Sequence, residues 1–344
     1  MSTLASHGSH VNSTAASRTD GWGKLPAEYA IPDKAPSLAE AQSYCERLAH
    51  THYENFSVAT WFLPRRLRPH FHSIYAYCRI SDDLGDEVGD AQQALALLDE
   101  WQRELEATYL SLDRVEQGVS PAVRVDDKTR ALAPETVGPR HPVFVALRET
   151  IRACQIPQHE FSDLLKAFRQ DQSVHRYETF DDLLGYCRYS ANPVGHLVLY
   201  GCGYRDAERQ QLSDYTCTAL QLANFWQDVS VDWQKGRIYL PLEDMRRFGV
   251  SEREIAERRP TTEFLKLMKF EVDRAREWFE RGLPLAGRVD RDLGIDIELF
   301  SRGGQEILKA IERQGFDVLR QRPAISKARK LWLVARAGMN RVIA

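Results

Sequence analysis

Apolar residues recur at helical spacing along most of the chain from about residue 37 onward. Leu222, Trp226, Val229 and Trp233 follow one another at intervals of four, three and four residues, which is the apolar stripe of a buried helix. Similar patterns predict helices over about 37–50, 69–88, 91–112, 142–155, 157–168, 179–200, 206–234, 251–258, 261–286, 297–315 and 323–340. Patterns typical of strands are almost absent. The sequence therefore predicts an all-α domain whose helices pack around a central space.

Local signals refine three of these predictions. Ser37 with Glu40, and Thr179 with Asp182, have the spacing of helix N-caps. Pro193 lies inside the helical pattern of 179–200 and should kink it, because proline cannot donate the backbone hydrogen bond. A kink there would open room for a long ligand, whereas the small residues Ala191 and Gly195 favour close helix packing.

Two stretches lack helical periodicity. Residues 1–35 are rich in Ser, Thr, Ala, Gly and Pro and are predicted to be a disordered tail. Residues 113–141 are polar, with scattered Pro and Gly, and are predicted to be a surface loop. The remainder, 36–344, is predicted to be a single domain.

Composition limits the classes of function. With 344 residues, 43% of them hydrophobic, the chain can bury a large core. A net charge of −3 gives no sign of nucleic-acid binding. Six cysteines without a Cys-x-x-Cys pair favour a reduced, cytoplasmic protein. We find no signal-peptide pattern and no apolar run near the roughly 20 residues that span a bilayer.

Membrane contact would therefore be peripheral. The stretch 326–344 carries five basic residues and no acidic one. It could lie on the inner, anionic face of a membrane. The other interpretation, which we favour, is that it is the last helix of the bundle.

Polar residues interrupt two apolar helices at the same spacing. Asp82 and Asp86 are four residues apart, as are Asp228 and Asp232, and Asn224 precedes the second pair by four. Residues at this spacing share one face of a helix. One such pair would most simply be a solvated face. Two pairs in apolar helices favour Mg²⁺, which prefers oxygen ligands and completes its shell with water and phosphate oxygens.

Basic and aromatic residues follow the same helices. Tyr75 and Arg79 precede the first pair on its face, and Lys235, Arg237 and Tyr239 follow the second. These groups could bind a diphosphate, although Lys235 and Arg237 could simply complement the negative end of their helix. P-loop, dinucleotide-binding, His-Glu-x-x-His, Glu-x-x-His and Gly-x-Ser-x-Gly motifs are all absent from the sequence. The sequence predicts a ligand that combines Mg²⁺ and diphosphate with an apolar remainder.

The chain resembles the squalene/phytoene synthase family of head-to-head isoprenyl diphosphate synthases over about 38–335. The segments that carry the resemblance are 55–87, 176–195, 220–241 and, more weakly, 322–334. The resemblance implies an isoprenoid synthase helical bundle and a prenyl diphosphate substrate. It implies two or three Mg²⁺ ions held, with the diphosphate, by Asp82, Asp86, Asn224, Asp228 and Asp232. It also implies diphosphate contacts from Arg79 and Arg237.

Gln227 distinguishes members of the family. Members that condense farnesyl or geranylgeranyl units usually carry Arg at this position, so one fixed positive charge is missing here. The amino-acid sequences of these motifs are most similar to those of bacterial members that convert presqualene diphosphate and water to hydroxysqualene in hopanoid biosynthesis. A condensing squalene, presqualene diphosphate or phytoene synthase is the second hypothesis. A non-catalytic prenyl-lipid-binding protein is the third, and two complete acidic motifs argue against it.

The hydration would need groups that orient water and stabilise a carbocation. Tyr75, Tyr186, Tyr189 and the amides of Asn224 and Gln227 are the candidates. Tyr186 and Tyr189 could equally be core residues with tethered hydroxyls. Enzymes of neighbouring pathway steps are predicted partners.

Overall fold

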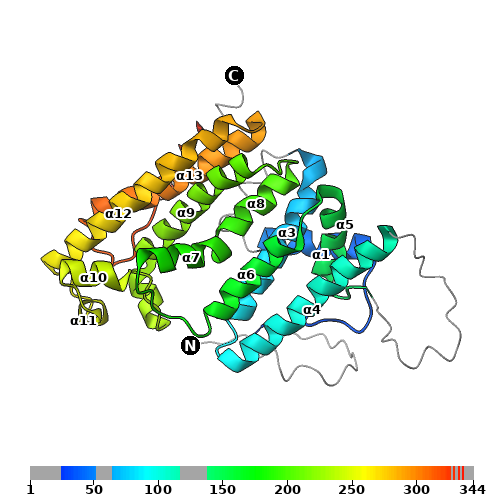
Figure 1. The fold of residues 1–344 in the computed structure, drawn as a ribbon, viewed down its shortest axis with the longest axis horizontal. Helices are drawn as coiled ribbons and strands as arrows, with labels where there is room; N and C mark the ends of the chain where they lie inside the picture. The colour runs from blue at the N-terminus through cyan, green and yellow to red at the C-terminus, as the bar shows by residue number, and fades with distance from the viewer. Residues whose placement is uncertain are drawn as a thin grey trace, which may run out of the picture.

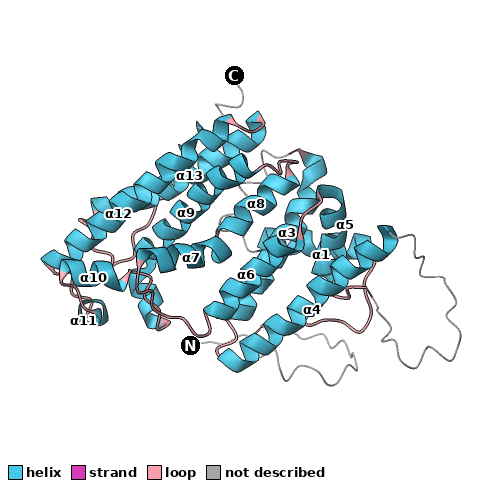
Figure 2. Cartoon of the chain, viewed as in Figure 1, coloured by secondary structure: helices cyan, strands magenta, loops and turns pink. Residues whose placement is uncertain are grey.

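The computed structural model describes residues 25–51, 64–116 and 138–326, with isolated positions from 328 to 336. These residues form only helices and connecting turns (Figures 1 and 2). The α-helices are α1 (Leu38–Thr51), α3 (Arg68–Asp86), α4 (Ala91–Glu116), α5 (Pro142–Cys154), α6 (Gln158–Gln170), α7 (Phe180–Ser190), α8 (Asn192–Gly201), α9 (Ala207–Gln234), α10 (Leu242–Phe248), α11 (Glu252–Ala256), α12 (Thr262–Gly282) and α13 (Arg291–Arg313). Short 3-10 helices cover Ala27–Tyr29, Arg65–Leu67 and Leu283–Gly287. The predicted all-α fold is confirmed.

The helices pack in two groups that meet at the middle of the molecule. Helices α1, α4 and α5 pack around α3 on one side, while α12 and α13 pack on α9 on the other. Helix α6 contacts α3, and α8 contacts α9, so these two helices join the groups (Figure 1). Helices α3 and α9, which carry the two acidic motifs, therefore lie at the interior of the fold.

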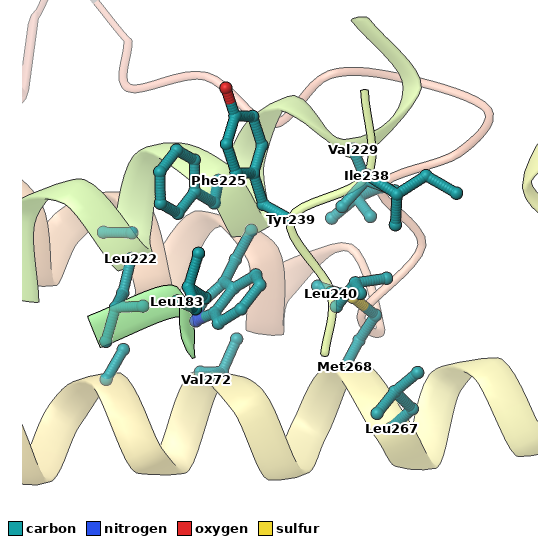
Figure 3. Close-up of a cluster of buried hydrophobic side chains, with 14 of the residues drawn as sticks. Leu183, Leu222, Phe225, Val229, Ile238, Tyr239, Leu240, Leu267, Met268 and Val272 are labelled. Atoms are coloured by element: carbon teal, nitrogen blue, oxygen red, sulfur yellow. The ribbon is translucent and has the colours of Figure 1, made fainter. Parts of the chain in front are cut away.

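Each group has its own apolar core. Tyr77, Trp101, Phe144 and Phe161 are fully buried in the first group, with their rings in edge or stacked contact. The second core lies between α9 and α12, where Leu267, Met268 and Val272 of α12 point toward Leu222 and Val229 of α9 (Figure 3). Because these side chains are buried against α12, they fix the position of α9 along its axis and therefore the position of its polar residues.

The predicted kink at Pro193 is confirmed. Helix α7 ends at Ser190, Ala191 leaves helical geometry with φ −120° and ψ −48°, and α8 begins at Asn192. The capping box of Thr179 and Asp182 starts α7 as predicted. Close packing at Gly195 is also confirmed, because a Cβ there would lie 2.1 Å from the Ser213 hydroxyl oxygen on α9. The kink therefore allows α8 to pack closely against α9 at Gly195.

Several predicted boundaries are wrong. Residues 25–35 are not a disordered tail, because Tyr29 is fully buried and its hydroxyl donates to Asp83 at 2.8 Å. Helix α4 continues to Glu116, and His141 is buried, so both ends of the predicted 113–141 loop are ordered. Helix α10 was missed because seven residues are too few to show a period. Residues 1–24 and 117–137, and most of 327–344, lie outside the described residues.

No described helix has both the length and the apolar character needed to span a bilayer.

Candidate active site

Helices α3 and α9 line one cavity of about 860 Å³. Asp82 and Asp86 enter it from α3, and Asn224, Asp228 and Asp232 enter it from α9. The two acidic motifs are 146 residues apart in sequence (228 − 82), yet the packing brings them to a shared wall. The grouping predicted from helical spacing is therefore present.

The rest of the cavity wall is largely apolar. Ile74, Leu164, Phe168, Val194 and Val198 line it from α3, α6 and α8. These side chains come from the first helix group and from the two helices that join the groups. A cavity with charges at one end and hydrocarbon surface elsewhere suits a ligand that has a polar head and a long apolar body.

In the first acidic pair, Asp86 is neutralised by basic side chains and Asp82 is not. Lys235 Nζ lies 3.0 Å from one oxygen of Asp86 and Arg237 Nη1 lies 2.9 Å from the other. Burial would raise the pKa of Asp86, but the Arg237 and Lys235 charges outweigh burial and lower it. Although solvent in the cavity reaches Asp82, the surrounding protein and the Asp86 charge raise its pKa to about 7.

The two carboxylates of the second acidic pair, Asp228 and Asp232, differ in the same way. Arg322 holds Asp228 with two hydrogen bonds, from Nε and from Nη2, the latter 3.0 Å from Oδ2. Asp232 has no ion pair with a described residue. Burial and the neighbouring Asp228 charge raise the pKa of Asp232 to about 7. In each acidic pair, one carboxylate forms an ion pair with a basic side chain and the other has no ion pair with a described residue.

The turn after α9 brings the basic residues back into the cavity. Gly236 has φ +77°, a conformation that glycine adopts without strain. The Arg237 backbone NH then donates to the Asp232 carbonyl at 2.9 Å. Two residues on, the Tyr239 ring stacks on Phe225 with centroids 3.9 Å apart, and its hydroxyl points away from α12 (Figure 3). Lys235, Arg237 and Tyr239 all line the cavity, as predicted.

The side chains present fit Mg²⁺. The described residues contain no group of three His, Cys, Asp or Glu already arranged around a point. Mg²⁺ does not need one, because it usually takes one or two protein carboxylates and fills its shell with water and phosphate oxygens. Burial and the neighbouring carboxylate raise the pKa of Asp82 and of Asp232, and the nearby basic side chains only partly offset this.

The predicted catalytic residues divide into two sets. Tyr75 and Tyr186 line the cavity, as does Arg79, which was predicted to contact the diphosphate. The guanidinium of Arg79 is bound to Asp83, with Nε 3.0 Å from Oδ2. Tyr189 and Gln227 are not among the lining residues. Tyr189 is half-buried against the second core, with the Lys166 ammonium 5.3 Å from its ring centroid.

Gln227 needs the larger correction. Its side chain is buried and does not line the cavity; it donates to the Pro323 carbonyl at 2.6 Å and accepts from Arg322 at 3.2 Å. Helical geometry explains this, since Gln227 is three residues from Asn224 but points about one residue's rotation away from Asp228. Both polar atoms of this amide are bound to the segment around Arg322 and Pro323 rather than directed into the cavity.

Sequence reasoning missed two residues. Asp171, at the end of α6, lines the cavity and accepts a hydrogen bond from the Tyr186 hydroxyl at 2.9 Å. Burial, partly offset by Arg237, raises the pKa of Asp171 to about 6. Arg322 is the other, and only the weak 322–334 resemblance pointed toward it. Neither residue belongs to a helical repeat that could have singled it out.

Comparisons with known proteins agree with this geometry. The family model for squalene/phytoene synthase matches residues 49–329. A hydroxysqualene synthase of Rhodopseudomonas palustris is 31% identical over 75% of this chain and 80% of the relative. A 15-cis-phytoene synthase of Synechococcus elongatus is 29% identical over 88% of this chain and 94% of the relative.

Solved structures give the same result. The squalene synthase HpnC from Alicyclobacillus acidocaldarius is 41% identical, with a TM-score of 0.70 over 86% of this chain and 99% of that one. A dehydrosqualene synthase complex is 25% identical, with a TM-score of 0.72 over 89% of this chain and 98% of that one. The chain belongs to the squalene/phytoene synthase family, and its fold is the all-α isoprenoid synthase fold. Members of the family process prenyl diphosphates.

Proposed function

We propose that this protein converts presqualene diphosphate and water to hydroxysqualene and diphosphate with the help of Mg²⁺. The observation that carries the proposal is the single cavity with both acidic motifs at one end and an apolar wall beyond them. The hydroxysqualene synthase relative supports the choice of reaction, and the similarity to the squalene synthase HpnC supports a product of the squalene type.

The residues that would hold Mg²⁺ are Asp82, Asp86, Asn224, Asp228 and Asp232. When bound, Mg²⁺ would neutralise the negative charge of the departing diphosphate. Lys235 and Arg237 already place positive charge at this end of the cavity, and their cationic forms are stabilised there. These side chains would bind and orient the diphosphate.

The other walls suit the cation that remains. Loss of diphosphate leaves a cyclopropylcarbinyl cation, which rearranges with opening of its three-membered ring. Water then adds to the rearranged cation to form the C–O bond, and one proton leaves that water. The rings of Tyr186, Phe225 and Tyr239 lie within 3.9–6.2 Å of one another and line the cavity with surfaces that stabilise positive charge. The apolar wall excludes bulk water, so that the cation can rearrange before one positioned water adds to it.

A condensing activity is the second candidate, and one observation favours it. Arg322 places a guanidinium next to Asp228, where the absence of Arg at position 227 had argued against condensation. The phytoene synthase match is 29% identical and covers 88% of this chain, whereas the hydroxysqualene synthase match is 31% identical and covers 75%. The identity of Gln227 therefore separates the two reactions less sharply than the sequence alone suggests.

One set of incubations tests the proposal. The purified protein is mixed with Mg²⁺ and, separately, with presqualene, farnesyl or geranylgeranyl diphosphate, without NADPH, and the products are identified. We expect hydroxysqualene from presqualene diphosphate. Phytoene from geranylgeranyl diphosphate, with no turnover of presqualene diphosphate, would replace the proposal with the second candidate. No turnover of any substrate would favour the non-catalytic prenyl-lipid-binding protein.

A peripheral membrane contact through 326–344, and association with neighbouring pathway enzymes, stay predictions. Binding of the chain to anionic vesicles would test the first.

A further inference from the structure

The chain segment 317–326, here called the C-terminal strap, lies across the end of α9. Val318 and Leu319 are buried in the second core, and Gln314 of the preceding turn donates to the Gln321 carbonyl at 3.1 Å. Beyond the strap, Arg329 binds the buried Glu306 of α13 with hydrogen bonds of 3.0 and 2.9 Å. The strap is thus fixed at both ends, and Arg322 lies between the fixed points.

Gln227 ties the middle of the strap to α9. Its amide nitrogen donates to the Pro323 carbonyl, and its amide oxygen accepts from Arg322 Nη2. The side chain of Gln227 is only 6% exposed, so both of its polar atoms depend on these contacts. The pair of bonds sets the position from which the Arg322 guanidinium reaches Asp228.

The Arg322 guanidinium occupies both oxygens of Asp228. Nε binds Oδ1 and Nη2 binds Oδ2, which is the two-pronged geometry that arginine forms with a carboxylate. A cation that takes oxygen ligands needs the same lone pairs. Arg322 and a metal ion therefore cannot both hold Asp228 in this way.

We propose that Gln227 is a positioning residue that holds Arg322 on Asp228, and that Mg²⁺ and the Arg322 guanidinium compete for this carboxylate. The inference rests on the metal site of the proposed function. When Mg²⁺ takes Asp228, the guanidinium is released but stays tethered beside the cavity. The strap thereby supplies a mobile positive charge next to α9, where position 227 itself has none.

Metal binding tests the competition directly. Mg²⁺ alone is titrated into the full chain by calorimetry, for the wild type, Arg322→Ala and Gln227→Met. We expect Arg322→Ala to bind Mg²⁺ about threefold to tenfold more tightly, because a competing charge-assisted pair is gone. Gln227→Met keeps the side-chain volume but loses both bonds, and should shift the Kd in the same direction by less.

Arg320→Ala is the matched control. Arg320 lies on the same strap with a side chain that is 70% exposed, and it pairs only loosely with Asp317 at 3.6 Å. Its loss should leave the Kd unchanged. In an Asp228→Asn background, Arg322→Ala should add nothing, since the shared carboxylate is already gone. Circular dichroism checks that each variant is folded.

The outcomes separate this inference from the proposed function. Mg²⁺ with inorganic diphosphate is titrated into the wild type in parallel, and absence of binding there would overturn the metal site and the inference with it. If the wild type binds but Arg322→Ala binds Mg²⁺ no more tightly than wild type, the competition is wrong and the metal site stands. An equal effect of Arg320→Ala would reduce the result to general surface charge.

Discussion

Acidic side chains meet between helices in two parts of this molecule, with opposite outcomes. On α6, α8 and α9, the His196 ring lies between two carboxylates, with Nδ1 3.0 Å from Glu160 and Nε2 2.8 Å from Asp214. On α3 and α9, Asp82 and Asp232 have no ion pair with a described residue. In the first cluster both carboxylates contact a cationic side chain, whereas in the second Asp82 and Asp232 do not.

The electrostatic consequences follow from that difference. Burial alone would lower the pKa of His196, but hydrogen bonds with Asp214 and Glu160 raise it to about 9, so the ring is charged at neutral pH. The pKa values of Asp82 and Asp232 rise to about 7 instead. Acids that the fold itself neutralises hold helices together. Acids that it leaves without an ion pair lie where we propose that an external cation binds.

The largest expected effect is on turnover. Asp82→Asn or Asp228→Asn should lower turnover by about a thousandfold or more, because each removes a charged oxygen ligand. Asp214→Asn, on the same helix α9 but next to His196, should lower turnover per folded molecule far less. Steady-state rates with presqualene diphosphate would measure this. Equal losses at Asp214 and Asp228 would erase the distinction between the two clusters.

The next largest effect is on stability, and here a change in the His196 cluster should have the greater effect. His196→Gln should lower the free energy of unfolding by about 2–4 kcal/mol, because it leaves Glu160, which is 2% exposed, without its cation. Denaturation in urea would measure the loss. Turnover of the folded fraction should be retained, and a variant with normal stability would show that the cluster does not hold the helices.

The pH dependence of that stabilisation has a definite sign. The pKa of His196 is higher in the fold than in the unfolded chain, where it is about 6.5. Its contribution is therefore complete below pH 6.5 and is lost as the pH rises to about 9. Wild type and His196→Gln should converge in stability over that range. The charged groups facing the ring are Glu160 and Asp214, with His159 3.4 Å from Glu160.

The smallest effect distinguishes a carboxylate that has no ion pair with a described residue, Asp232, from one that basic side chains compensate, Asp86. Without Mg²⁺ at pH 7–8, Asp232→Asn should raise the melting temperature by about 1–3 °C, since the raised pKa means that the folded state disfavours the charged form. Asp86→Asn should lower it, because the pKa of Asp86 is lowered by its bonds with Arg237 and Lys235. Thermal melts of both variants would decide. A rise for both would mean that Lys235 and Arg237 do not compensate Asp86.

The sequence predicted what depends on local periodicity. The acidic residues of α3 and α9 lie where their four-residue spacing puts them, and the break before Pro193 lies where backbone chemistry requires it. Helix capping at Thr179 was equally local. These features need no knowledge of which other segment lies nearby.

The residues that the sequence misplaced or missed depend on contacts with segments far away in the chain. Gln227 was predicted to be catalytic because of its neighbours in sequence, yet its partners are 95 and 96 residues away in the C-terminal strap. Asp171 is recognisable only once α6 and α7 pack, so that Tyr186 reaches it. No periodic signal marks such residues, because their positions are set by tertiary packing.

Tyr29 has a practical consequence for anyone who produces this protein. Its hydroxyl binds Asp83 at 2.8 Å, and the same carboxylate receives the Arg79 guanidinium beside the cavity. An expression boundary placed at residue 36, where composition alone puts the start of the domain, would delete this side chain. It would leave Asp83, which is 5% exposed, with one fewer donor next to Asp82. A shortened chain intended for assays should therefore begin before Leu25.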